Sequence, residues 1–348
     1  MQIIKPIAIT DTEFVSSTVV ETAPAAYAAG TTYGSGTDVT VASGDVLKVY
    51  RSLQAGNVGH TPSSSPTWWQ YISDTYAEYS AATTYALGAR CQMASSHKVY
   101  ESLQAANLNH SPVTSPTYWL EIGTTNRWAM FDGKVGTKST ATDSIAVSVL
   151  PGGINALACM EVDADSIYVT LTDPTSGEVY SRTISVSSEA DISDWFKYFF
   201  TPFSSSSDMV LTDLPAFSAA TLDVTLFKMG KMVTCGMMIV GLLGDLGELQ
   251  WEPQVSIIDY SRKEVDAFGN PTLTVRDYSK KLSADLLIDS SKVDAVYRLL
   301  AQFRATPLVW IGSELYSCMI IYGFYRGFAI VISGPVVSAC SLEIEGLI

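Results

Sequence analysis

The sequence has little charge, few basic residues and no long apolar run, and each shortage excludes a class of function. Only 16% of its 348 residues are charged, and the formal net charge is −14. Because phosphate binding needs clustered basic side chains, this balance argues against nucleic acid as a partner. The longest apolar run, residues 232–243, is too short to span a bilayer and contains Gly236 and Gly241. The N-terminal segment has no signal-like apolar core, so the sequence predicts neither membrane insertion nor secretion.

Residue types that carry catalysis or bind metals are also scarce. The three histidines, His60, His97 and His110, leave the C-terminal half without a base for a serine or cysteine nucleophile. His60 and His110 recur at matching positions, but neither has a second ligand nearby, which favours turn-capping loop histidines over a metal pair. The five cysteines are scattered without a C-x-x-C motif and predict mostly buried free thiols, made in a reducing cytoplasm. We therefore expect no enzyme, no cofactor and no metal site.

One catalytic alternative stays open. A glycoside hydrolase needs two suitably placed carboxyl groups, and an acidic chain always offers candidates. Solvated loop charges explain the densest acidic cluster equally well. Its members are Glu248, Glu252, Asp259, Glu264 and Asp266.

A duplication is the most informative positive feature. Residues 50–72 return as residues 100–122, and residues 31–36 return as residues 83–88. Both copies are rich in tyrosine and tryptophan and poor in charge. A repeated unit this short and aromatic is typical of tandem binding modules rather than of catalytic domains.

Each repeat carries the residue types that sugar binding needs, which are flat aromatic rings and a few short polar groups. Trp69 and Trp119, each followed three residues on by isoleucine, are expected in the module cores. Trp68 and Tyr118 point the other way on a strand and are the more exposed candidates. The candidate glycan-binding residues are Tyr33, Tyr50, Asn57 and Trp68 in the first repeat and Tyr85, Tyr100, Asn107 and Tyr118 in the second.

Outside the repeats, period-2 alternation with frequent turn residues predicts antiparallel β structure. We expect a mainly β protein, with two small tandem β modules inserted near the N-terminus of a β-sandwich and a C-terminal α+β domain after it. Two helices are predicted, over residues 190–200 and from Ser290 or Ser291 to Phe303. The expected domains are residues 1–22 (strand or arm of the main body), 23–73 and 79–123 (repeats), 124–252 (β-sandwich) and 253–348 (α+β assembly domain).

The repeats resemble the small carbohydrate-binding modules of bacterial chitinases. The shared pattern is Tyr-x-x-Gly-x-x-Val, then a tyrosine, then a proline and a closing tryptophan. It is carried by Tyr33, Gly36, Val39, Tyr50, Pro62 and Trp69, and by Tyr85, Gly88, Tyr100, Pro112 and Trp119. The second copy departs from it with Cys91 at the valine position. The resemblance implies polysaccharide binding.

The remainder resembles tail-tip and baseplate proteins of tailed bacteriophages and prophages. The strings that carry this resemblance lie in residues 3–21, 124–137, 259–270, 305–313 and 322–347, and include NRWAMFD and DYSRKEVDAFGN. The resemblance implies a structural virion component, assembled in the host cytoplasm as a homo-oligomer with other tail proteins. Its modules would face host-surface polysaccharide. The alternatives are a dedicated receptor-binding protein and a polysaccharide-degrading enzyme.

Overall fold

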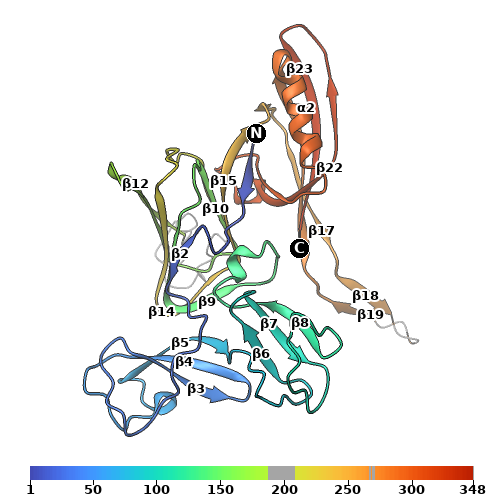
Figure 1. Ribbon diagram of the computed structural model, residues 1–348. Helices are drawn as coiled ribbons and strands as arrows, with labels where there is room; N and C mark the ends of the chain where they lie inside the picture. The colour runs from blue at the N-terminus through green and yellow to red at the C-terminus, as the bar shows by residue number, and fades with distance from the viewer. Residues whose placement is uncertain (187–207, 266–267, 269–270, 348) are drawn as a thin grey trace.

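The structure, a computed structural model, describes residues 1–186, 208–265, 268 and 271–347. It is mainly β, which confirms the predicted fold class. The helix predicted over residues 190–200 lies outside the described residues. Figure 1 shows the arrangement: two small modules next to each other, a β-sandwich, and a tall C-terminal unit that carries the helix.

A ten-stranded sheet, sheet A, runs through the whole main body in the order β13-β10-β15-β1-β21-β22-β23-β20-β16, with β17 also paired to β20. The N-terminal strand β1 (Gln2–Ile7) lies in its middle, between β15 (Met237–Asp245) and β21 (Leu308–Ile311). The sandwich and the C-terminal unit therefore share one sheet. Its other strands are β10 (Ala156–Met160), β13 (Met209–Leu211), β16 (Glu248–Leu249), β17 (Gln254–Asp259), β20 (Tyr278–Asp289), β22 (Ile320–Val331) and β23 (Val337–Gly346).

A second sheet, sheet B, has five strands in the order β12-β11-β14-β9-β2 and closes the sandwich over β10, β13 and β15. Its strands are β2 (Phe14–Ser17), β9 (Ser139–Val149), β11 (Ser166–Asp173), β12 (Gly177–Ser185) and β14 (Thr221–Cys235). The fully buried side chains Leu157, Ile145, Ile167 and Leu222 form part of the shared core. The chain crosses from sheet B to sheet A directly after Cys235, between the end of β14 and the start of β15 at Met237.

Gly236 makes this crossing possible. A Cβ atom at Gly236 would lie only 2.7 Å from Glu161 Cβ. The apolar run of residues 232–243 is therefore interrupted at Gly236, where the chain leaves sheet B and enters sheet A.

The helix α2 (Val293–Gln302) covers one face of the C-terminal strands. Val296 and Leu300 pack there among residues of β20 and β23 such as Leu282 and Leu342. The predicted helix position is confirmed. Its predicted cap is wrong, because the Asp289 side chain accepts the Ser291 amide proton at 2.9 Å and starts a short 3₁₀ turn, η4 (Ser290–Lys292), ahead of α2.

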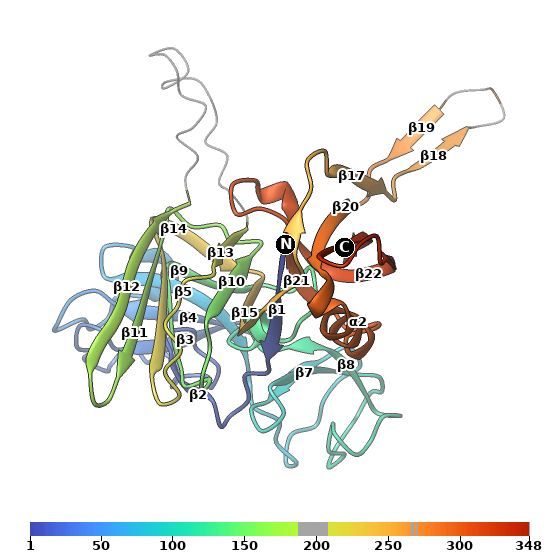
Figure 2. The same ribbon diagram turned by 90° about the horizontal axis from the view of Figure 1, so that it is seen from above.

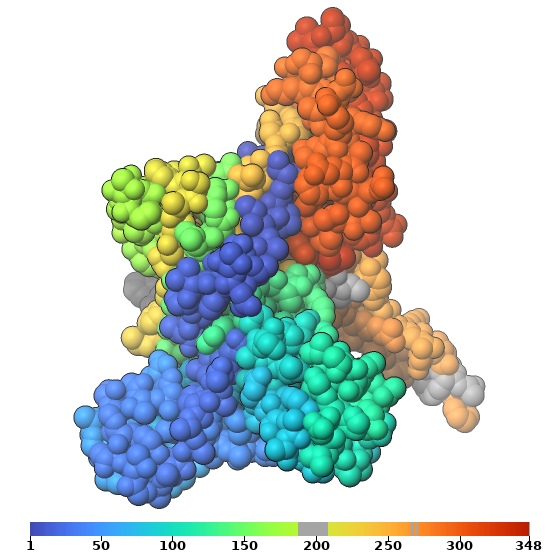
Figure 3. Space-filling view, in the orientation of Figure 1, coloured from blue at the N-terminus to red at the C-terminus, as the bar shows by residue number. Residues whose placement is uncertain are grey.

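Each repeat forms a three-stranded antiparallel sheet. Module 1 contains β3 (Asp38–Ser43), β4 (Val46–Ser52) and β5 (Trp69–Tyr76), and module 2 contains β6 (Arg90–Met93), β7 (Lys98–Ser102) and β8 (Trp119–Thr124). As predicted, Trp69 and Trp119 are core residues, 2% and 3% exposed. Figure 3 shows the modules as two lobes below the main body.

The two modules differ in what covers their third strand. Ile72 is buried, whereas its counterpart Ile122 is 39% exposed. The reason is docking: β5 lies against β9 of the sandwich, where Gln70 donates to the Asp143 carboxylate. The strand β8 of module 2 has no such cover at Ile122.

Glu21 joins both modules to the body. Its backbone oxygen accepts hydrogen bonds from Thr75 Oγ1 of module 1 at 2.7 Å and from Gln92 Nε2 of module 2 at 2.6 Å. Its carboxylate lies 2.8 Å from His97 Nδ1 and 3.2 Å from Trp128 Nε1 of the body. One residue between the N-terminal arm and module 1 thus holds three parts of the chain together.

Cys91 takes the core position that Val39 fills in module 1. Burial raises the pKa of the Cys91 thiol to about 12, so the thiol stays protonated at neutral pH and packs as an apolar group. Four of the five cysteines are buried free thiols, as predicted, and Cys318 is exposed.

This burial pattern gives a direct test. In the native protein, we expect a maleimide reagent at pH 7 to label Cys318 alone within minutes, because only that thiol is open to solvent. In urea all five thiols should react. Mass spectrometry of the labelled chain counts the adducts, and rapid labelling of Cys91 in native buffer would contradict the closed core of module 2.

Candidate functional site

The same hydrogen-bond frame positions the candidate site in both modules. Asn57 exchanges backbone hydrogen bonds with Tyr33 at 2.8 and 3.1 Å. Its side-chain Nδ2 donates to Ser52 Oγ at 3.0 Å and to the Trp68 carbonyl at 3.3 Å. Asn107 makes the equivalent bonds to Tyr85, Ser102 and Tyr118 in module 2. A positive φ nearby, 72° at Gly56 and 54° at Ala106, turns each chain into this frame.

Five of the predicted glycan-binding residues are buried inside the modules. Asn57 and Asn107 are 0% and 1% exposed and hold loops in place, so their side chains cannot reach a ligand. Tyr33, Tyr85 and Tyr100 are at most 8% exposed. The prediction of ligand contact is wrong for these five because a module of about fifty residues needs its tyrosine side chains to fill the core.

The tyrosine rings explain how such a small core is filled. Tyr33 packs edge-on against Trp69 with ring centroids 5.2 Å apart, and Tyr85 does the same against Trp119 at 4.9 Å. Edge-to-face packing of this kind stabilises beyond simple area burial by about 0.5–1.5 kcal/mol per pair. Tyr50 is half-buried and packs edge-on against Tyr71.

Trp68 and Tyr118 remain on the surface, where a histidine stacks on each ring. The His60 ring lies parallel to Trp68 with centroids 4.1 Å apart and an interplanar angle of 11°. His110 stacks on Tyr118 at 3.5 Å and 15°. We call each stacked pair an aromatic rung. The rung is half-exposed in both modules.

The core tryptophans hold the rungs in place. Trp69 Nε1 donates to the His60 carbonyl at 2.8 Å, and Trp119 Nε1 donates to the His110 carbonyl at the same distance. The histidines were expected to cap turns. Their backbone carbonyls accept these hydrogen bonds from the core tryptophans, whereas the stacking of their rings was not predicted. The signal was present, since both histidines precede an aromatic residue by eight positions.

Exposed aliphatic residues recur beside the rungs. Leu53 and Leu103, which follow the buried serines of the frame, are each 43% exposed, and Leu53 N donates to the Trp68 carbonyl at 2.9 Å. Val58 and Leu108 are 46% and 48% exposed. Each module therefore presents the same flat, partly apolar surface. Such a surface can stack a sugar ring or dock a protein.

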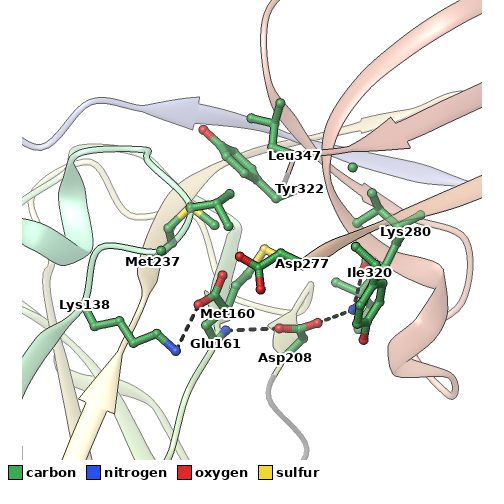
Figure 4. Close-up of a pocket in the computed structure, with 15 residues that line it drawn as sticks. Lys138, Met160, Glu161, Asp208, Met237, Asp277, Lys280, Ile320, Tyr322 and Leu347 are labelled. Atoms are coloured by element: carbon green, nitrogen blue, oxygen red, sulfur yellow. Dashed lines mark hydrogen bonds and ion pairs between the residues drawn. The ribbon is translucent and has the colours of Figure 1, made fainter. Parts of the chain in front are cut away.

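A hollow of about 510 Å³ lies between the sandwich, the start of β20 and the C-terminal end of β23. Figure 4 shows four of its charged side chains in two ion pairs, Lys138 with Glu161 at 3.0 Å and Lys280 with Asp208, with Asp277 beside them. Asp208 also accepts the Glu161 amide proton at 3.1 Å. These contacts cross between strands, so the hollow is best explained as a charged joint in the body.

The acidic cluster singled out in the sequence does not converge on this hollow. Glu264 pairs with Arg262 at 3.0 Å, and Asp259 accepts the Ser261 amide proton at 2.8 Å. Hydrogen bonds from the Ser261 side chain and from its backbone amide lower the pKa of Asp259. Glu248 and Glu252 are exposed at and beyond the short strand β16, and Asp266 lies outside the described residues.

Comparison with protein-family models finds no match for this chain, and neither does comparison with curated proteins. In the described part of the chain, α2 is ten residues long and no helix there could span a membrane. Among the same residues, no three His, Cys, Asp or Glu side chains gather as metal ligands. What the site can do has to be argued from the two rungs.

Proposed function

We propose that this chain is a structural component of a bacteriophage tail tip or baseplate that displays two carbohydrate-binding modules for attachment to the host surface. It would assemble with copies of itself and with other tail proteins. The observation that carries the binding half is the pair of aromatic rungs, built by the same bonds in both modules and left at the surface.

Stacking chemistry supports the choice of a carbohydrate. The C–H bonds of a pyranose pack on the face of an aromatic ring, and a histidine stacked on that ring holds the ring in one orientation before binding. One such weak contact corresponds to millimolar affinity. Two modules on each chain, and several chains in one assembly, raise the effective affinity without any new contact.

The organisation of the chain supports the structural half. The modules are inserted between β2 and η2 (Ala129–Phe131), so β1 and β2 still belong to the sheets of the body. The composition, with 16% charged residues and a mean hydropathy of +0.19, suits a protein that buries surface against neighbours. A dedicated receptor-binding protein is the alternative, and it needs no such assembly.

Retention on polysaccharide tests the binding half. We expect the full-length chain to be retained by insoluble chitin, by cellulose or by polysaccharide from the host surface. The double variant Trp68→Ala, Tyr118→Ala should lose about tenfold in affinity per rung, because each lost stacking contact costs on the order of 1.4 kcal/mol. A pull-down with densitometry at several protein concentrations measures the change.

Trp251→Ala is the matched control, because Trp251 is 98% exposed but lies outside the modules. It removes an exposed indole without touching a rung, and it should bind like the unmodified chain. Equal retention of the double variant and the unmodified chain would overturn the assignment of the rungs. A lack of retention on every polysaccharide tested would overturn the glycan half of the proposal.

A further inference from the structure

A two-stranded ribbon projects from the main body beyond the paired strands β17 and β20. It consists of β18 (Arg262–Val265) and β19 (Pro271–Thr274), paired in antiparallel register from Arg262↔Thr274 to Val265↔Pro271. Figure 2 shows it extending well clear of the rest of the chain. All eight of its strand residues are exposed. An isolated ribbon of this kind is only marginally stable in water.

The ribbon has one apolar and one polar face. Directly opposed residues share a face, so Val265 and Leu273 lie on one side with Lys263, and Val275 continues that side just after β19. These three apolar side chains are 59%, 71% and 87% exposed. The other face carries Thr272, Thr274 and the Arg262–Glu264 ion pair. Alternation of this kind is typical of a strand pair that is covered on one side.

The same chain has a second uncovered face that could receive the ribbon. On β20, β23 and β22, the residues turned away from α2 include Asp285, Ser341 and Ala329, which lie side by side in register. All three are exposed. Beside them the rim residues Leu287 and Val331 are 36% and 60% exposed.

This second face is flat, shallow and acidic. It forms a groove of about 440 Å³ whose lining includes Ser283, Gly327 and Ala329, together with the carboxylates Glu252 and Asp285. Small side chains let a second layer approach closely. Neither Glu252 nor Asp285 has an ion pair within the described residues, and the same holds for Lys263 on the apolar face of the ribbon.

We propose that the apolar face of the ribbon in one copy of this chain packs into the acidic groove of a second copy. The occupant is assigned from complementarity: an apolar ribbon face with an unpaired lysine meets an apolar-rimmed groove with two unpaired carboxylates. Figure 1 shows the ribbon and the β22–β23 hairpin extending in opposite directions, so a chain cannot fill its own groove. The contact is therefore heterologous and generates a closed ring or an open filament.

This inference deepens the assembly half of the proposed function and is independent of glycan binding. The test is the mass in solution of three forms of the full-length chain at tens of micromolar, by light scattering after gel filtration. We expect the unmodified chain to form an oligomer. The ribbon variant Leu273→Asp, Val275→Asp and the groove variant Asp285→Arg, Ala329→Arg should each fall to the monomer mass of 37.5 kDa.

Mixing the two variants distinguishes this contact from any other. The ribbon variant keeps an intact groove and the groove variant keeps an intact ribbon, so an equimolar mixture can form one contact and should give a heterodimer. The control Thr272→Asp, Thr274→Asp alters the polar face of the same ribbon and should leave the oligomer intact. Far-ultraviolet circular dichroism confirms that every variant is folded.

Three results would overturn the proposal: a monomeric unmodified chain, a ribbon variant that keeps the oligomer mass, or a mixture that stays monomeric. A fourth is a groove variant that keeps the oligomer mass, which would indicate a ribbon-to-ribbon contact instead. Loss of glycan retention in the separate pull-down would leave this inference untouched, whereas a monomeric unmodified chain that still binds polysaccharide would favour the receptor-binding alternative.

Discussion

Replacing Gly241 with alanine should destabilise the main body by about 3 kcal/mol or more, at the upper end of overpacking effects. Gly241 lies in β15 opposite Pro6 of β1. A Cβ atom there would lie 2.0 Å from the Lys5 carbonyl oxygen and 3.0 Å from Ile4 Cγ2. The first contact is with backbone in the centre of sheet A, so the strands themselves have to separate. Calorimetry should show the melting temperature of the body falling by roughly 10 °C.

Gly123→Ala is the matched control for this prediction. Gly123 is also a strand glycine, in β8, but a Cβ atom at that position meets no atom within 4 Å. Its replacement should change stability by no more than about 0.5 kcal/mol. Equal melting temperatures for the two alanine variants would mean that β1 and β15 can move apart at little cost, and that β1 is not a fixed member of sheet A.

The fold was predictable from the sequence where the signal is local. The apolar stripe of α2 placed that helix to within a few residues. What the sequence could not supply was the pairing of distant strands. Nothing local in residues 2–7 says that β1 lies between β15 and β21, because that choice depends on contacts more than two hundred residues apart.

For the candidate site, residue type was a poor guide to exposure. Trp68 and Tyr118 are more exposed than Trp69 and Trp119, as predicted, but each lies in the turn before the strand rather than on it, and packs against the edge of the module core. Asn57 suggested a sugar hydroxyl partner, yet its amide is used to satisfy buried groups of its own module. In a small domain, the same aromatic and amide residue types occur in the core and at the surface, and only the folded structure shows which position is which.

The junction at Glu21 could not be foreseen from the sequence, because its partners lie in three separate segments. The Glu21 side chain is 5% exposed. In addition to its contacts with His97 and Trp128, its carboxylate accepts a hydrogen bond from Thr125 Oγ1 at 2.7 Å and lies 3.6 Å from the Arg127 guanidinium. Burial lowers the pKa of Arg127, and the Glu21 carboxylate opposes that effect. The carboxylate therefore joins module 2 to the body through His97, whereas module 1 contacts only the backbone oxygen of Glu21.

Glu21→Ala should therefore cost about 3–5 kcal/mol, the usual result of removing one partner from a buried charged network. The variant leaves His97, Arg127 and Trp128 without their shared acceptor. Urea unfolding followed by tryptophan fluorescence measures the loss, since Trp128 sits at the junction.

Asp11→Ala is the control that separates burial from charge. Asp11 also lies close to His97, 3.0 Å from Nε2, but its side chain is 76% exposed. Losing a solvated carboxylate should cost less than about 1 kcal/mol. If the two variants unfold at the same urea concentration, the junction is an ordinary surface contact and the modules are free to move. If Glu21→Ala alone unfolds early, module 2 is held to the body through this buried carboxylate, because its removal leaves His97, Arg127 and Trp128 without their shared partner.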